Sequence, residues 1–131
     1  MGQDRVTLTV PAKSEYAKTV RMTASALVSR MGMSYDEVED VRMAADEAFI
    51  YAVETLSADD EVRFEFTIAD AEIIIDVAVG DAELEDDEDG ETRASYATFI
   101  LESVCDGVEF ASDEQGPHLR LRKRVGSADG D

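Results

Sequence analysis

Short segments in which apolar and polar residues alternate recur along the chain, and this period of two predicts β-strands. The first of them is residues 5–10. The same alternation, or a short apolar run, predicts further strands at residues 62–68, 72–79, 108–111 and 118–125. Pro11 is expected to end the first strand. Tight turns at Asp70 and around Gly116–Pro117 are expected to join the later strands into two pairs.

Three other segments carry apolar residues three to four positions apart, the spacing that places them on one face of a helix. They predict helices at residues 14–31, 34–56 and 94–105. Ser14 is expected to cap the first helix and Gly32 to end it. Ser34-Tyr35-Asp36-Glu37 is typical of a capping box, in which Ser34 and Glu37 satisfy opposite backbone donors.

The elements follow the order strand, helix, helix, strand, strand, helix, strand, strand. This order predicts a two-layer α/β sandwich of the α+β class, in which a mostly antiparallel sheet carries its helices on one face. A single domain is expected over residues 1–125, followed by a disordered tail at 126–131. Residues 80–92 are crowded with Asp and Glu, which predicts a mobile loop.

The formal net charge of −19 in 131 residues narrows the classes of partner. It argues against direct binding to nucleic acid, because affinity for phosphates comes largely from clustered Lys and Arg. A basic protein partner is the more natural interpretation. The alternative is that the acidity only maintains solubility.

Cysteine content and apolar runs indicate where the protein works. The single cysteine, Cys105, excludes an internal disulfide and fits a small core residue in a reducing, cytoplasmic location. The longest apolar runs, such as residues 73–75, are too short to cross a bilayer, and no export signal is recognised. We therefore expect a soluble protein with no membrane association.

Several motifs then indicate a family. The element order, with an acidic loop before the third helix, resembles the GHKL ATP-binding (Bergerat) fold shared by histidine kinases and gyrase. The chain is more narrowly similar to the anti-sigma-factor serine kinases of the RsbW type, through Val10-Pro11-Ala12, Ser29-Arg30-Met31-Gly32, the segment from Ser34 to Asp40, and Ala45-Asp46-Glu47-Ala48. The resemblance covers nearly the whole chain and is strongest in its first half.

The resemblance implies a partner-switching role. Members of this family hold a sigma factor in an inactive complex and phosphorylate a serine on a small antagonist protein. The expected partners are therefore a sigma factor and such an antagonist. Family members commonly pair, so a homodimer is also implied.

The resemblance also implies a site on the second helix. Glu47 matches the family's glutamate, which would orient or deprotonate the attacking hydroxyl. Tyr51 stands where the family has a magnesium-binding Asn, and a phenol is too long and too weak a ligand for that ion. The structural alternative for Glu47 is the polar margin of an amphipathic helix. No metal site is therefore predicted.

In the second half of the chain, the family's ATP-contacting pattern is mostly replaced. Asp81 matches the aspartate that would read the adenine amino group, but the glycine expected two residues later is Glu83. The threonine expected early in the last strand is His118, which alone is more typical of a partly exposed strand residue. The glycines of the phosphate loop correspond to Ala94, Ser95 and Ala97.

The charge of the loop also weakens the expected binding of the cofactors ATP and magnesium. Seven carboxylates lie between residues 81 and 92, and a loop closing over a magnesium nucleotide would bring them towards a net negative ligand. Each would contribute a few tenths of a kcal/mol of repulsion at the surface. We expect ATP binding to be weak or absent.

Two other local patterns have competing explanations. Glu85, Asp87 and Asp89 before Gly90 faintly resemble a calcium loop, but the position of its required final Glu is Tyr96, so we reject that site. The last strand presents a row of basic residues on one side, either as a solvated face paired with neighbouring carboxylates or as a basic patch for a partner; the row is His118, Arg120, Arg122 and Arg124.

Three functional hypotheses follow. The first is a binding protein, an RsbW-type regulator that grips a sigma factor or an antagonist with its kinase activity decayed. The second is an active serine kinase that uses Glu47 and Asp81. The third is a structural or dimerisation module without a sigma factor.

Overall fold

The computed structural model describes residues 3–80 and 93–126. Its elements are β1 (Asp4–Pro11), a 3-10 turn η1 (Ser14–Tyr16), α1 (Ala17–Val28), α2 (Tyr35–Thr55), β2 (Glu61–Ile68), β3 (Glu72–Ala78), α3 (Arg93–Glu102), β4 (Gly107–Asp113) and β5 (Gly116–Arg124). The predicted order of strands and helices is confirmed. The acidic loop and the tail that the sequence predicts as mobile fall at 81–92 and 127–131, outside the described residues.

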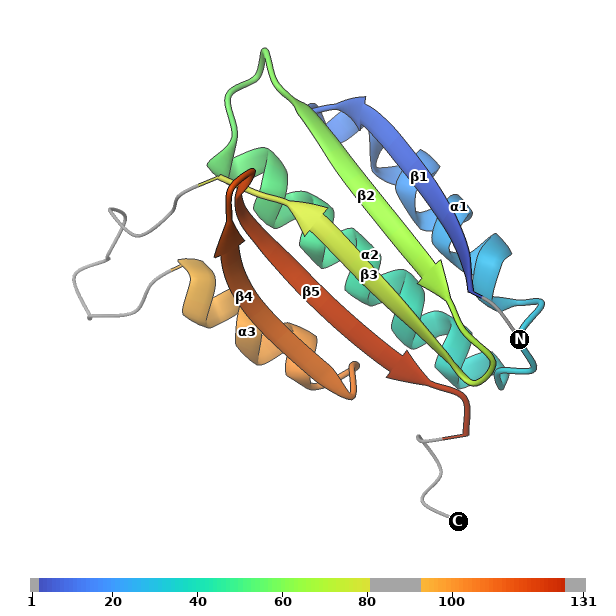
Figure 1. Cartoon of the computed structure of the whole chain (residues 1–131). Coiled ribbons are helices and arrows are strands. Elements are labelled where there is room, and N and C mark those ends of the chain that lie inside the picture. Colours follow the sequence, from blue (N-terminus) through green and yellow to red (C-terminus); the bar gives the residue numbers. More distant parts are fainter. Residues whose placement is uncertain (1–2, 81–92, 127–131) are drawn as a thin grey trace.

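The sheet has the strand order β1-β2-β3-β5-β4, and each neighbouring pair is antiparallel. Figure 1 shows α1, α2 and α3 together on one face of this sheet, with α1 behind β1 and α3 behind β4. The opposite face, here called the open face, carries no helix in the described part of the chain. The predicted two-layer sandwich is confirmed.

Strand alternation builds the core. Because side chains on a strand point alternately to the two faces, the apolar members of each strand turn together towards the helices. The buried ones include Val62, Phe64, Phe66, Ile73, Ile75, Val77, Leu119 and Leu121. Phe64 stacks on Phe66 at a centroid distance of 5.7 Å and meets Phe49 of α2 at 6.4 Å, so aromatic contacts join the two layers.

The predicted capping box at the start of α2 is confirmed. Ser34 Oγ accepts a hydrogen bond from the Glu37 backbone N–H at 3.1 Å, and Glu37 Oε1 accepts one from the Ser34 backbone N–H at 2.8 Å. The buried Glu37 also accepts a hydrogen bond from the Gly126 backbone N–H through Oε2, at 2.6 Å. The same carboxylate therefore starts α2 and fixes the chain just after β5 to it.

Two predicted boundaries are wrong for local reasons. Ser14 does not cap α1: it begins η1, and the residue before α1 is Tyr16, which makes no side-chain capping bond. The turn between the last two strands lies at Glu114–Gln115, and Gly116 and Pro117 already belong to β5. Gly116 has a φ of 112°, which glycine adopts without steric cost. It therefore closes the turn and is at the same time the first residue of β5.

A lysine shares the apolar side of β5. Lys123 is buried, with 7% of its side chain exposed, and its Nζ donates to Asp40 Oδ2 of α2 and to the Val104 carbonyl after α3, both at 3.1 Å. A buried ammonium group requires such partners. Lys123 therefore ties β5 to both neighbouring helical segments.

Candidate functional site

The site implied by the resemblance begins on α2, where Glu47 and Tyr51 lie one turn apart. Tyr51 is buried, with 3% of its surface exposed. Its ring meets Phe110 of β4 edge-on, with centroids 5.5 Å apart and an interplanar angle of 64°. The Tyr51 ring is thus part of the packing between the helix layer and the sheet. The sequence indicated Tyr51 but not Phe110, whose position depends on the pairing of β4 with β5.

Glu47 lies half-buried on the same helix. The preceding residue, Asp46, accepts a hydrogen bond from Arg21 Nη1 of α1 at 3.0 Å, which joins the two helices beside it. A carboxylate that remains partly accessible can accept a proton from a hydroxyl group brought to it. Glu47 therefore keeps partial access to solvent, whereas the ring of Tyr51 is enclosed.

The end of β3 is fastened to the end of α2 close to this pair. Thr55 Oγ1 donates to the Tyr51 carbonyl at 2.9 Å and accepts a hydrogen bond from the Gly80 backbone N–H, also at 2.9 Å. A Cβ at Gly80 would lie 1.9 Å from the Thr55 carbonyl oxygen, so only glycine permits this approach. The backbone that leads into Asp81 therefore starts from a fixed point.

The described residues include only some of the positions predicted to contact ATP. Asp81 and Glu83 lie outside the described residues, as do Glu85, Asp87, Asp89 and Gly90 of the rejected calcium loop, and the side chain of Ala94 is not described. Of the remaining phosphate-loop positions, Ala97 is completely buried in the core and Ser95 is exposed on α3. The adenine-reading role of Asp81 stays a prediction.

His118 lies apart from Glu47 and Tyr51. In the strand register it pairs with Ala78 and Ala111, and its neighbour Leu119 is the residue that turns towards the helices. His118 therefore belongs to the open face, where 23% of its side chain is exposed and Nδ1 lies 3.8 Å from Asp113 Oδ2. The structure does not bring it together with the two residues on α2.

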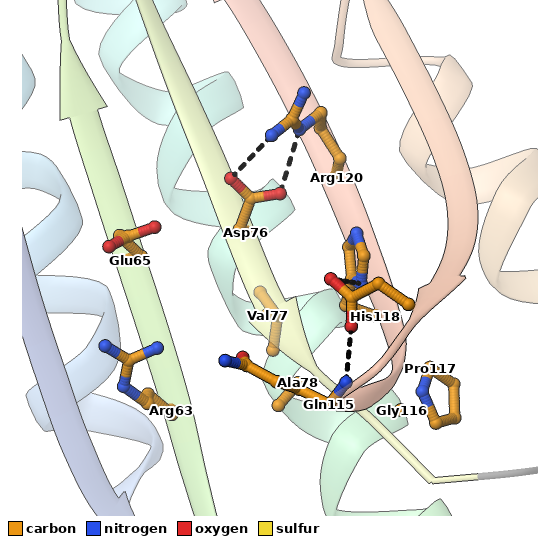
Figure 2. A pocket seen from close by; sticks show the side chains of 11 residues that line it. Arg63, Glu65, Asp76, Val77, Ala78, Gln115, Gly116, Pro117, His118 and Arg120 are labelled. Atoms are coloured by element: carbon orange, nitrogen blue, oxygen red, sulfur yellow. Dashed lines mark hydrogen bonds and ion pairs between the residues drawn. The ribbon is translucent and has the colours of Figure 1, made fainter.

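Figure 2 shows the part of the open face around His118. A pocket of about 170 Å³ lies there between β2, β3 and β5 and is lined by Arg63, Glu65, Asp76, His118 and Arg120, among others. This volume is below the roughly 300 Å³ of small ligand pockets. The pocket has room for a side chain or a small ion, but not for a nucleotide.

The basic row of β5 pairs with carboxylates on β3. Arg120 donates to Asp76 through Nε at 2.9 Å and through Nη2 at 3.4 Å, and these hydrogen bonds are the main reason that the pKa of Arg120 is raised. Arg122 and Arg124 lie 3.4 and 4.0 Å from Glu72, although Arg122 Nε makes no well-directed hydrogen bond to a described residue. The predicted pairing of this row with carboxylates on neighbouring strands is confirmed.

Cys105 follows α3 and packs against the core. Burial raises the pKa of its thiol to about 12, which keeps it protonated near neutral pH. In the described part of the chain, no group of three or more His, Cys, Asp or Glu residues is arranged to hold a metal ion. No described helix is long and apolar enough to cross a membrane.

Comparison with known proteins identifies a family that this chain matches. Residues 10–123 match the model of the histidine kinase-like ATPase domain. The serine-protein kinase RsbW of Listeria monocytogenes is 27% identical over 128 residues, covering 85% of this chain and 82% of that protein. The RsbW of Bacillus subtilis is 37% identical over 78 residues, covering 57% of this chain and 49% of that protein.

A solved structure shares the fold. A crystal structure of the RsbU and RsbW domains of a Mycobacterium tuberculosis protein superposes with a TM-score of 0.70 and 17% identity. The match covers 93% of this chain and 32% of the other, so this chain corresponds to about a third of that longer protein.

Proposed function

This chain belongs to the histidine kinase-like ATPase domain family, and we propose that it acts as an RsbW-type partner-switching regulator with weak or lost ATP binding. In this role the protein grips a sigma factor, a small antagonist protein, or each in turn. Binding to the partner, rather than transfer of a phosphoryl group, is then its main activity. The similarity to RsbW proteins supports binding to a sigma factor or an antagonist, and the packing around Tyr51 supports weak or lost ATP binding.

The observation that carries the proposal is the burial of Tyr51 against Phe110. By resemblance this is the position of the magnesium-binding Asn, and an enclosed phenol does not fit a small ion that requires octahedral oxygen ligands. Moving the ring aside would expose apolar surface that the fold now buries. This cost opposes entry of a magnesium nucleotide from the side of α2.

The net charge supports a basic protein as the partner. Sigma factors carry basic surfaces for DNA, and a chain with a charge of −19 would meet such a surface faster than a neutral one. The acidic residues also oppose a second negative ligand such as ATP. Electrostatics therefore favours partner binding over nucleotide binding.

An active serine kinase is the second candidate. The relatives that match this chain are named serine-protein kinases, and Glu47 is half-buried rather than enclosed. In that case Glu47 would accept the proton of the attacking serine hydroxyl. Nucleotide would then have to bind through contacts other than an Asn at position 51.

A thermal-shift titration with ATP, with and without magnesium, separates the two candidates. A ligand present at 100 times its Kd stabilises the folded state by about 2.7 kcal/mol, which raises the melting temperature by roughly 10 °C for a domain of this size. We expect a shift of less than about 1 °C at millimolar ATP. A large magnesium-dependent rise in melting temperature would support the kinase and would show that the proposed loss of ATP binding is wrong.

Partner binding is tested with purified sigma factors and small antagonist proteins of the source organism, each titrated by calorimetry against this protein and its Glu47→Ala variant. We expect at least one of them to bind, and to bind both forms equally. Loss of antagonist phosphorylation in Glu47→Ala would support the kinase instead. If no sigma factor or antagonist binds, the protein is a structural or dimerisation module and the proposed function is wrong.

A further inference from the structure

The outer side of α3 forms a groove with β4, and two exposed aromatic rings lie among its polar lining residues. Most amphipathic helices bury one stripe, but α3 has apolar residues on both sides: Ala97 and Leu101 are completely buried, whereas Phe99 is 75% exposed. A shallow groove of about 330 Å³ runs between Phe99 and Phe110, which is itself 38% exposed. Large exposed aromatic side chains that line one depression mark an interaction site.

The strand beside this groove is an open edge. Among the described residues β4 pairs with β5 alone, so one side of the strand carries a row of backbone N–H and C=O groups without a strand partner. Proteins commonly protect such edges with Lys, Pro or a bulge. The seven residues of β4 contain no Lys or Pro and pair with β5 in an unbroken register. As far as the described residues show, the edge is therefore open to another extended segment.

The segment that contains this edge is acidic, although Glu109 faces Arg120 of β5 in the strand register. Five acidic residues and no Lys or Arg lie between residues 102 and 114, and these acidic residues are Glu102, Asp106, Glu109, Asp113 and Glu114. Within β4 the acidic side chains Glu109 and Asp113 lie on the opposite face of the sheet from Phe110, which lines the groove. Glu109 points to the open face because it pairs with Arg120, and Asp113 lies on the same face, 3.8 Å from His118. Phe110 pairs with Leu119 and turns towards the helices.

We propose that the edge of β4 is a docking surface for an extended, basic segment of a partner protein. The segment adds a strand to the sheet, and its residues alternate between apolar and basic. The apolar side chains enter the groove between Phe99 and Phe110, and the Lys or Arg side chains lie on the open face near Glu109 and Asp113. This inference rests on the proposed binding function, for which it supplies the surface and the chemistry of the partner.

The pattern distinguishes this partner from a helix. A helix laid in the groove would use apolar residues three to four positions apart and would leave the edge of β4 unpaired. A strand uses the unpaired backbone groups and the groove together, and its period of two matches the alternation of Phe110 and Glu109. The unprotected edge therefore favours the strand.

The probe is a short synthetic peptide in which Lys alternates with Val around a central Phe, measured by calorimetry at about 150 mM salt to screen general attraction. Its control peptide has the same composition with the Lys residues grouped at one end. We expect the alternating peptide to bind more than about tenfold tighter than the grouped one, because only alternation satisfies both faces. Equal binding of the two peptides would overturn the proposal.

Matched variants locate the binding. Phe99→Ala is compared with Met22→Ala on α1, since both replace an exposed apolar helix residue, and Glu109→Lys is compared with Glu61→Lys at the start of β2. We expect Phe99→Ala and Glu109→Lys each to weaken the alternating peptide by about tenfold and the two controls to change it less than about twofold. A control that weakens binding as much as its test variant would overturn the proposal.

Hydrogen–deuterium exchange separates this inference from the proposed function. The alternating peptide, and any sigma factor or antagonist that binds, should slow exchange of the backbone amides of residues 107–113. A partner protein that binds but leaves these amides unchanged overturns the surface and leaves the proposed function standing. If the peptide protects these amides and no sigma factor or antagonist binds, the surface is supported and the proposed function is wrong.

Discussion

Replacing Tyr51 with alanine should destabilise the protein strongly if its ring is part of the packing between α2 and the sheet. The ring is buried and meets Phe110 edge-on at 5.5 Å. Removing a buried aromatic ring costs about 3–5 kcal/mol, and we expect about 3 kcal/mol because the partly exposed Phe110 can move into the space. Tyr51→Phe keeps the ring and should cost no more than about 1 kcal/mol.

A double-mutant cycle isolates the contact. Phe110→Ala alone should cost about 2 kcal/mol, less than Tyr51→Ala, because 38% of Phe110 is already exposed. An edge-on aromatic pair contributes about 0.5–1.5 kcal/mol beyond burial, so the double variant should be about 1 kcal/mol more stable than the sum of the single changes predicts.

The assay is urea unfolding followed by far-ultraviolet circular dichroism, since the chain has no Trp. With a slope of about 2 kcal/mol per molar urea, a loss of 3 kcal/mol lowers the midpoint by about 1.5 M. A cost below about 1 kcal/mol for Tyr51→Ala, or additive single changes, would show that the ring is not held in the packing. The observation that carries the proposed function would then be lost.

Three further predictions concern the residues around the site. Gly80→Ala should lower the free energy of unfolding in urea by more than about 2 kcal/mol, because its Cβ would lie 1.9 Å from the Thr55 carbonyl oxygen. Gly107→Ala, whose Cβ would lie no closer than 3.6 Å to another residue, should be nearly neutral. Equal effects of the two changes would contradict the close approach at Gly80. Lys123→Ala should cost about 2 kcal/mol, less than for a fully buried pair because its carboxylate partner is 29% exposed, and a change below about 0.5 kcal/mol would show that the ammonium group is not held. The Cys105 thiol should react with iodoacetamide at pH 8 far more slowly in the folded protein than in urea, and fast labelling of the folded protein would contradict its burial. Because the pKa of the thiol is about 12 in the folded protein and 9.0 in the unfolded chain, the free energy of unfolding should fall as pH rises from 9 towards 12.

The family resemblance places the candidate site on α2, and helix geometry predicts which of its residues share a face, but neither predicts which of these side chains is enclosed. The sequence predicts that Glu47 and Tyr51 share one face of α2, because residues four apart lie one turn above each other. It does not predict which of the two is enclosed. That depends on Phe110, which reaches Tyr51 from a strand 59 positions later in the chain.

The boundary errors have a local cause. Ser14 and Gly116–Pro117 are residues that commonly cap helices or form turns, so the sequence favours them for those roles. In the structure a 3-10 turn precedes α1, and the pairing of β4 with β5 extends to Asp113 and Gly116. Strand pairing supplies hydrogen bonds that outweigh the local turn preference of Gly116 and Pro117.

Local patterns in the chain were enough to predict the order of the elements, the faces of the strands, the capping box and the dominance of negative charge. Each of these depends on the period of a helix or strand, or on composition, and both are properties of neighbouring residues. Packing in three dimensions buries Lys123, brings Gly80 against the backbone of Thr55 and places His118 on the face away from Tyr51. These facts depend on strand order, register and helix packing, which bring together side chains that are distant in the sequence and that no local pattern connects.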